Sequence, residues 1–201
     1  MEITFEYLNK LLSETNSKRK QFVYSVIDET DAEIAYMNSK KDLCIGRQCG
    51  LMNELRLQQF KVREQPQLRK GSKNYLRIVK KDNRIAKIDS FINGRIDVVF
   101  LPYYETDMRY LFPFFNNGGS YPTYTYVTVY VDGMVSEEYR VNSHQIVYER
   151  YEKKDTNKVL YSRINYVPNG THKVLDSEKG IIEYNSSIIY TRIEGKTWMD
   201  D

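Results

Sequence analysis

The 201-residue sequence has few of the residues that metal, catalytic and membrane chemistry require. It contains two cysteines, two histidines and one tryptophan, and no apolar run approaches the ~20 residues of a membrane-spanning helix. Cys44 and Cys49 lie in LCIGRQCG without further ligands at zinc spacing, which predicts two free thiols and no metal site. The N-terminus lacks the basic segment and apolar core of a secretory signal. We therefore expect a cytoplasmic protein with no membrane partner.

Recognised catalytic motifs are also missing. The sequence has no G-x-S-x-G, no P-loop, no G-x-G-x-x-G after a strand and no H-E-x-x-H. His144 and His172 lie on or beside expected strands and turns, without a nucleophile or carboxylate placed next to them by a motif. The adjacent Glu137 and Glu138 point to opposite faces of a strand. The sequence predicts a protein that is not an enzyme, with no catalytic residues and no cofactor; a carboxylate pair from separate strands stays open.

The first third of the chain has helical periodicity. Apolar residues recur at helical spacing in segments 3–12, 18–41 and 51–65, and Pro66 ends the last of them. The polar stretch 15–17 is typical of a helix stop followed by a new N-cap. We predict a helical N-terminal region over 1–70.

From about residue 74 the apolar period changes to two, which is typical of strands. Turn dipeptides separate the strands at Asn93-Gly94, Asp132-Gly133, Asn169-Gly170 and Glu194-Gly195. No helical pattern lies between the strands, so the sheet is expected to be antiparallel. The predicted fold class is α+β. The helical N-terminal third packs on a large antiparallel sheet of hairpins or meander over 71–201, and the two regions form one compact domain.

Tyrosine is abundant, with 18 residues against eight phenylalanines. A two-residue turn at Asp132-Gly133 would place Tyr126 opposite Tyr139 and Tyr130 opposite Val135, leaving the valines 127, 129 and 131 on the other, core face. The tyrosine face could be covered by the N-terminal helices, or it could be an open aromatic patch for a partner. Both interpretations stay open.

The stretch LPYYETDMRYLFPFF, residues 101–115, is predicted to be a loop surface that carries aromatic side chains around two prolines. Together with the tyrosine face it supplies the candidate partner-binding residues. These are Tyr103, Tyr104, Tyr110, Phe112, Phe114, Tyr124, Tyr126 and Tyr139.

The middle of the chain is basic. Residues 47–87 contain twelve Lys and Arg against three acidic residues, although the whole chain has a net charge of only +3. The candidate basic patch consists of Arg69, Lys70, Lys73 and Arg77. Such a patch suits nucleic acid or an acidic protein, and it is equally typical of a solvated helix face and loop.

Three segments share a pattern of strand, turn with glycine, and strand with alternating tyrosines and charges. They are KIDSFINGRIDVV, VTVYVDGMVSEEYRV and INYVPNGTHKV. In these segments the chain resembles the immunity proteins that bacteria encode beside polymorphic toxins. The resemblance implies a binding protein that forms a tight complex with a cognate toxin or other protein partner and occludes its active site. The alternative is a nucleic-acid-binding accessory or phage-encoded protein that uses the basic residues 47–87.

Overall fold

A single antiparallel sheet dominates the computed structural model, which describes residues 4–21, 27–38, 63–115, 124–167, 173–184 and 188–197. Its eleven strands pair in the order of the sequence, β1 to β11. The elements are α1 (Phe5–Gln21), β1 (Glu33–Asn38), β2 (Tyr75–Lys81), β3 (Arg84–Ile92), β4 (Arg95–Tyr104), β5 (Met108–Phe115), β6 (Thr125–Val131), β7 (Met134–Val141), β8 (Ile146–Asp155), β9 (Lys158–Val167), β10 (Lys173–Tyr184) and β11 (Ile188–Thr197).

The predicted α+β fold, with a helical N-terminal third packed on the sheet, is wrong, because one antiparallel sheet makes up most of the described structure. α1 is the one helix among the described residues, and β1 lies inside a segment that we predicted to be helical. The apolar residues of this short segment fit the helical period and the strand period equally well. Pairing with β2 over six residues makes the segment a strand. Most of the helix predicted at 51–65 lies outside the described residues.

α1 also continues through 15–17, where we predicted a stop. Thr15 is buried on the same stripe as Leu8 and Leu11, so the packed face of the helix extends beyond the polar residues. Near the end of α1, the Lys18 ammonium hydrogen-bonds Glu105 and the Tyr110 hydroxyl. These contacts hold the second half of the helix against the sheet.

The prediction of an antiparallel sheet of consecutive hairpins is confirmed. Asn93-Gly94 and Asp132-Gly133 form two-residue turns in which both residues have positive φ, between 51° and 76°. Asn169-Gly170 lies outside the described residues. Glu194-Gly195 is not a turn, because both residues lie within β11.

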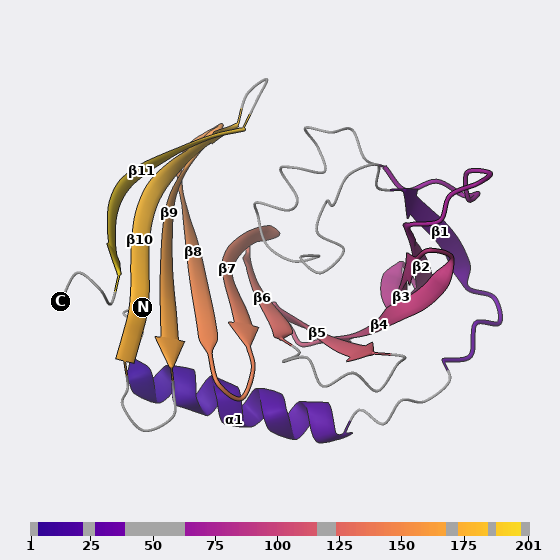
Figure 1. Ribbon diagram of the computed structural model, residues 1–201, viewed down its shortest axis with the longest axis horizontal. Helices are drawn as coiled ribbons and strands as arrows, with labels where there is room; N and C mark the ends of the chain where they lie inside the picture. The colour runs from indigo at the N-terminus through magenta and orange to yellow at the C-terminus, as the bar shows by residue number, and fades with distance from the viewer. Residues whose placement is uncertain are drawn as a thin grey trace.

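The sheet is strongly bent, and β1–β3 and β8–β11 rise on either side of β5–β6 (Figure 1). α1 lies along the outside of the bend (Figure 1), against what we call the helix face of the sheet. The buried core between them consists of Leu8, Leu11, Tyr110, Phe112, Val127, Tyr139, Val141, Ile146, Tyr148 and Tyr166.

The opposite face is buried as well. One cluster there joins β2–β6, and a second, smaller cluster joins β7–β10. They contain Leu76, Ile78, Ile88, Val98, Phe100, Leu111 and Tyr126, and Val135, Tyr151, Val159, Tyr161 and Ile182. Tyrosines on both faces of the central strands are therefore core residues.

The predicted β6–β7 register is confirmed at the turn and wrong beyond it. Tyr130 pairs with Val135 as predicted, but Tyr139 pairs with Val127 and not with Tyr126. The register shifts by one residue at this point, which leaves Ser136 as an extra residue in β7. Because a one-residue shift exchanges the faces of a strand, Tyr139 lies on the helix face and Tyr126 on the opposite face.

Candidate functional site

Four of the eight aromatic candidates are buried. Tyr110, Phe112 and Tyr139 are at most 1% exposed, and Tyr126 is 9% exposed. The Tyr139 hydroxyl donates to Glu137 Oε2 at 2.6 Å, and burial, reinforced by this carboxylate, raises its pKa, so it stays protonated as a donor. These side chains pack the sheet and offer no surface to a partner in this conformation.

The predicted loop surface at 101–115 is wrong, because this segment forms the end of β4 and the whole of β5, joined by a short turn. Pro113 pairs with Phe100 inside the sheet. Tyr103 is 37% exposed, whereas the Tyr104 hydroxyl donates to the Ile85 carbonyl at 3.2 Å. The stretch was misjudged because residues of both parities are apolar where a sheet is covered on both faces.

Three candidates are half-buried, namely Tyr104, Phe114 and Tyr124. Phe114 packs against the core under α1. The Tyr124 hydroxyl donates to the Gln145 side chain. Of the eight aromatic candidates, Tyr103 is therefore the most accessible to a partner.

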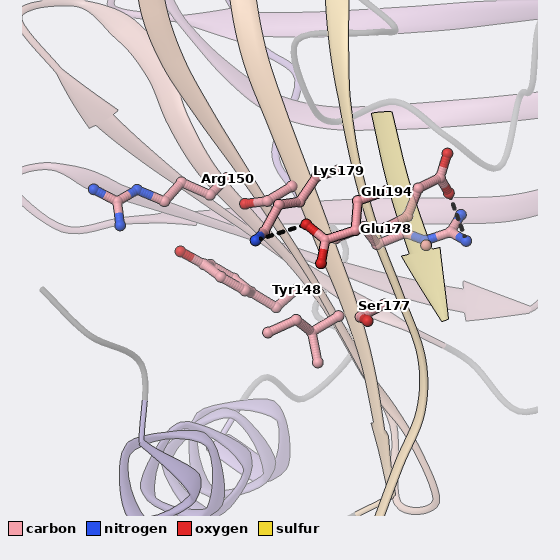
Figure 2. Close-up of a pocket in the computed structure, with 10 residues that line it drawn as sticks. Tyr148, Arg150, Ser177, Glu178, Lys179 and Glu194 are labelled. Carbon is pink, nitrogen blue, oxygen red and sulfur yellow. Dashed lines mark hydrogen bonds and ion pairs between the residues drawn. The ribbon is translucent and has the colours of Figure 1, made fainter. Parts of the chain in front are cut away.

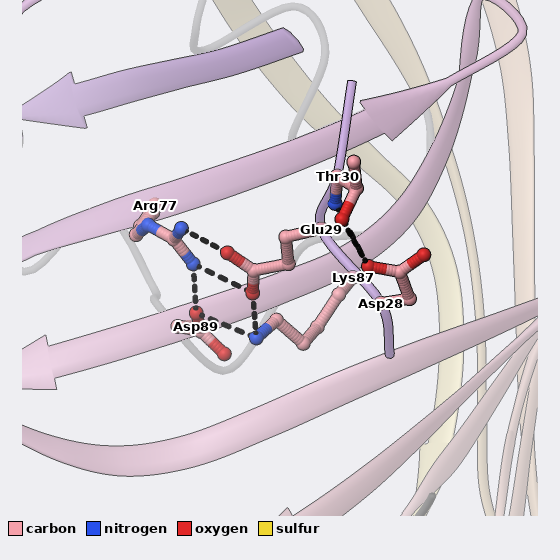
Figure 3. Close-up of polar contacts among 6 residues, drawn as sticks. All are labelled: Asp28, Glu29, Thr30, Arg77, Lys87 and Asp89. Atoms are coloured by element: carbon pink, nitrogen blue, oxygen red, sulfur yellow. Dashed lines mark hydrogen bonds and ion pairs between the residues drawn. The ribbon is translucent and has the colours of Figure 1, made fainter. Parts of the chain in front are cut away.

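The structure divides the candidate basic patch. Arg69, Lys70 and Lys73 are exposed in the segment before β2. Arg77 lies on β2 and points into a cluster of charged residues instead (Figure 3). The positive charge at Arg77 is therefore neutralised within the fold.

The charged cluster joins the segment before β1 to strands β2 and β3 (Figure 3). Arg77 donates to Glu29 Oε1 at 3.0 Å and to Asp89 Oδ2 at 2.9 Å. The Lys87 ammonium bonds Glu29 and lies 3.3 Å from Asp89. The Asp89 side chain is 3% exposed, so its charge depends on these two cations.

Acid is expected to weaken this cluster. Hydrogen bonds from Arg77, which outweigh the opposing effect of burial, lower the pKa of Glu29 from 4.5 to about 2. A lowered folded-state pKa gives stability that is full above the unfolded pKa and is lost as the pH falls from about 4.5 toward 2. Urea unfolding at pH 7, 4 and 2.5 should show this loss, and Glu29→Gln should reduce it. An unchanged acid profile in Glu29→Gln would contradict the role of Glu29.

The two edges of the sheet differ. At β1, the Tyr36 amide and carbonyl each bond Gln65 at 2.8 Å, so residue 65 covers that edge. At the other end, β11 pairs with β10 on one side and with no described residue on its outer side. Alternate backbone amide and carbonyl groups of an edge strand point away from the sheet and have no strand to pair with.

β11 also exposes apolar side chains. Ile189 is 52% exposed, Tyr190 39% and Ile193 60%. Ile193 is an extra residue where the register between β10 and β11 shifts, because Lys179 pairs with Glu194 and Gly180 with Arg192. A long edge strand with exposed apolar residues is unusual in a protein that acts alone, because such edges invite pairing with another chain.

Close packing holds β11 against β10. A Cβ at Gly180 would lie 2.4 Å from the Tyr190 ring and 2.8 Å from the Thr191 carbonyl oxygen. The ring could move, but the backbone oxygen could move only with the strand.

Gly180→Ala should therefore destabilise the β10–β11 pair by about 1–3 kcal/mol. Hydrogen exchange should show it as lost protection in β11. Gly195→Ala is the matched control, since a Cβ there meets only the mobile end of the Arg192 side chain. Equal effects of the two substitutions would contradict the packing argument.

A pocket of about 490 Å³ lies on the helix face beside β11 (Figure 2). Its lining comes from β8–β11 and includes Tyr148, Arg150, Ser162, Ile164, Ser177, Lys179 and Glu194. Arg150, Ser162, Lys179 and Glu194 are direct neighbours across β8, β9, β10 and β11. Two cations thus flank a serine hydroxyl in one row of the sheet.

A pair of carboxylates from separate strands does exist, on the opposite face. Glu138 lies directly across from Glu149 on the neighbouring strand. Glu149 accepts hydrogen bonds from Tyr151 and Arg140, both at 2.6 Å, and from Tyr161 at 3.2 Å. These three donors engage both oxygens of Glu149, which supports a role in holding the strands together.

The predictions for the two cysteines and for one histidine concern residues outside the described ranges, namely Cys44, Cys49 and His172. Within the described ranges, no group of three or more histidine, cysteine or acidic residues could hold a metal ion. Among the same residues, no helix has the length and hydrophobicity that a membrane span requires.

No protein-family model, no curated protein and no solved structure matches this chain.

Proposed function

We propose that this protein binds another protein at the open edge of its sheet, in the manner of an immunity protein that occludes the active site of a cognate toxin. The observation that carries the proposal is β11, an edge strand of ten residues whose described side chains from 189 to 195 are all exposed. The resemblance of the hairpin segments to immunity proteins is the ground for proposing an inhibitory role. The exposed edge strand is the ground for proposing where the partner binds.

An extended segment of the partner fits this edge. A strand added by the partner would form hydrogen bonds with the outward-pointing backbone groups of β11, and its side chains would cover the exposed apolar side chains of β11. The segment Ile188–Arg192 pairs regularly with β10, whereas the bulge at Ile193 interrupts the ladder. We therefore place the added strand along Ile188–Arg192, with Ile193 contacting the partner beside it.

Nucleic-acid binding by an accessory or phage-encoded protein is the second candidate. Its support is the exposed group Arg69, Lys70 and Lys73, without Arg77. Because few phosphates can be neutralised by three cations, the affinity should be modest and should fall steeply with salt.

Capture of the tagged protein's partner from the native host, with and without nuclease, tests the proposal. We expect one stoichiometric protein that survives a wash at moderate salt and is indifferent to nuclease. Recovery of nucleic acid that disappears on nuclease treatment would contradict the proposal and favour the second candidate.

A further inference from the structure

We propose that the pocket on the helix face of β8–β11 binds a small ligand that carries an oxyanion, a carboxylate or a phosphate, on an apolar body. The proposal concerns the free protein and needs no protein partner. Its failure would therefore leave the proposed function untouched.

The first argument is that the guanidinium of Arg150 is not taken up by a carboxylate of the protein. Glu137 lies directly across from Arg150 and would be its natural partner. Glu137 instead accepts hydrogen bonds from Tyr139 at 2.6 Å and from Tyr148 at 3.2 Å. Arg150 consequently has no hydrogen bond or ion pair within the described part of the chain, and no dashed line reaches its side chain in Figure 2.

The second argument is the arrangement of the row. Ser162 pairs with Arg150 on one side and with Lys179 on the other. Two strand spacings separate the backbones of the cations by roughly 10 Å, so long side chains can meet over the serine. An oxyanion there would accept from the serine hydroxyl, from the forked arginine donors and from the ammonium.

The Lys179 ammonium can give up its present partner, Glu194, to bind such an oxyanion. Its ion pair with Glu194 has an N–O distance of 3.0 Å, and the two side chains are 60% and 68% exposed. Exposed pairs of this kind contribute little to stability. A ligand can therefore replace Glu194 at small cost.

The size and the neighbouring row argue for an apolar body. The volume of about 490 Å³ lies within the range of small-molecule sites. Next to the cations, the pocket is lined by the Tyr148 ring and the Ile164 side chain. An inorganic anion would leave this part of the pocket empty, whereas an aryl or alkyl group would fill it.

Titration calorimetry of the full chain with phenyl phosphate, benzoate and inorganic phosphate at low salt tests the proposal. We expect saturable binding of phenyl phosphate or benzoate at about millimolar concentration, at least about fivefold tighter than inorganic phosphate. The tighter of the two organic probes identifies the oxyanion. No saturable binding of either, or equal affinity for inorganic phosphate, would overturn the proposal.

Arg150→Gln should weaken binding of the better probe about tenfold or more, because the two charged hydrogen bonds that a guanidinium can donate to an oxyanion are lost. Lys154→Gln, on the same strand but outside the pocket, is the matched control and should bind like the wild type. Equal weakening by both variants would mean that net charge alone attracts the probe, and would also overturn the proposal. Thermal unfolding should change little in Arg150→Gln, since the substitution breaks no hydrogen bond or ion pair among the described residues.

Discussion

Replacing Ile189 and Ile193 together by lysine is expected to weaken partner binding about 30- to 100-fold while leaving the protein folded. Each side chain keeps about half of its surface exposed in the free protein. Burying that remainder against a partner is worth roughly 1–1.5 kcal/mol per residue, and the sum corresponds to that loss of affinity. Lysines on an edge strand also oppose the addition of another strand. Calorimetry with the captured partner measures the affinity, and circular dichroism checks the fold.

Val131 and Met134 supply a matched control for this result. They are 54% and 49% exposed, flank the β6–β7 turn and lie away from β11. Lysine at both positions makes the same chemical change at a different apolar site. We expect the control to bind the partner like the wild type. Equal losses in the two double variants, or no loss in either, would contradict binding at the β11 edge.

Replacing Arg77 by methionine is expected to lower the free energy of unfolding by roughly 3 kcal/mol. The substitution removes the cation that bonds both Glu29 and Asp89 and leaves the buried Asp89 with Lys87 as its remaining described cation. Removing one partner of a buried ion pair typically costs about 3–5 kcal/mol, and the partial exposure of Arg77 places the effect at the lower end. Urea unfolding followed by circular dichroism provides the measurement.

The double variant Arg77→Met with Asp89→Leu shows whether the loss of stability comes from the unpaired charge of buried Asp89 or from lost side-chain packing. If the loss comes from an uncompensated buried charge, removing that charge should restore much of the stability. Lys179→Met provides an exposed control and should change stability by less than about 1 kcal/mol. Additive losses in the double variant would show that Asp89 is stabilised in another way.

The sheet was predictable from the sequence because period-two alternation and Asn-Gly or Asp-Gly turns are local signals. The turns at Asn93 and Asp132 have the expected positive φ. β1 was missed because its strand state depends on pairing with β2, some forty residues later in the chain. The β6–β7 faces were misassigned because the register shifts at Ser136, and no residue type in the sequence marks that extra residue.

The candidate sites were less predictable than the fold. The last apolar, alternating segment of the sequence was recognised as a strand, but its place at the edge of the sheet follows from the order of all eleven strands. The row from Arg150 to Glu194 depends on three successive registers, including a shift between β10 and β11. Glu194-Gly195 was misread as a turn because the dipeptide also suits a strand next to a bulge, where Arg192 packs over the glycine.

Hydrogen exchange of the free and partner-bound protein tests the edge-binding account most directly. We predict that the outward-pointing amides within 188–192 exchange about tenfold or more slowly in the complex, because an added strand accepts their hydrogen bonds. Amides of β1, at the covered edge, should be unchanged. Protection confined to 101–115 or to the segment around Lys70, with β11 exchanging as in the free protein, would contradict binding at the open edge.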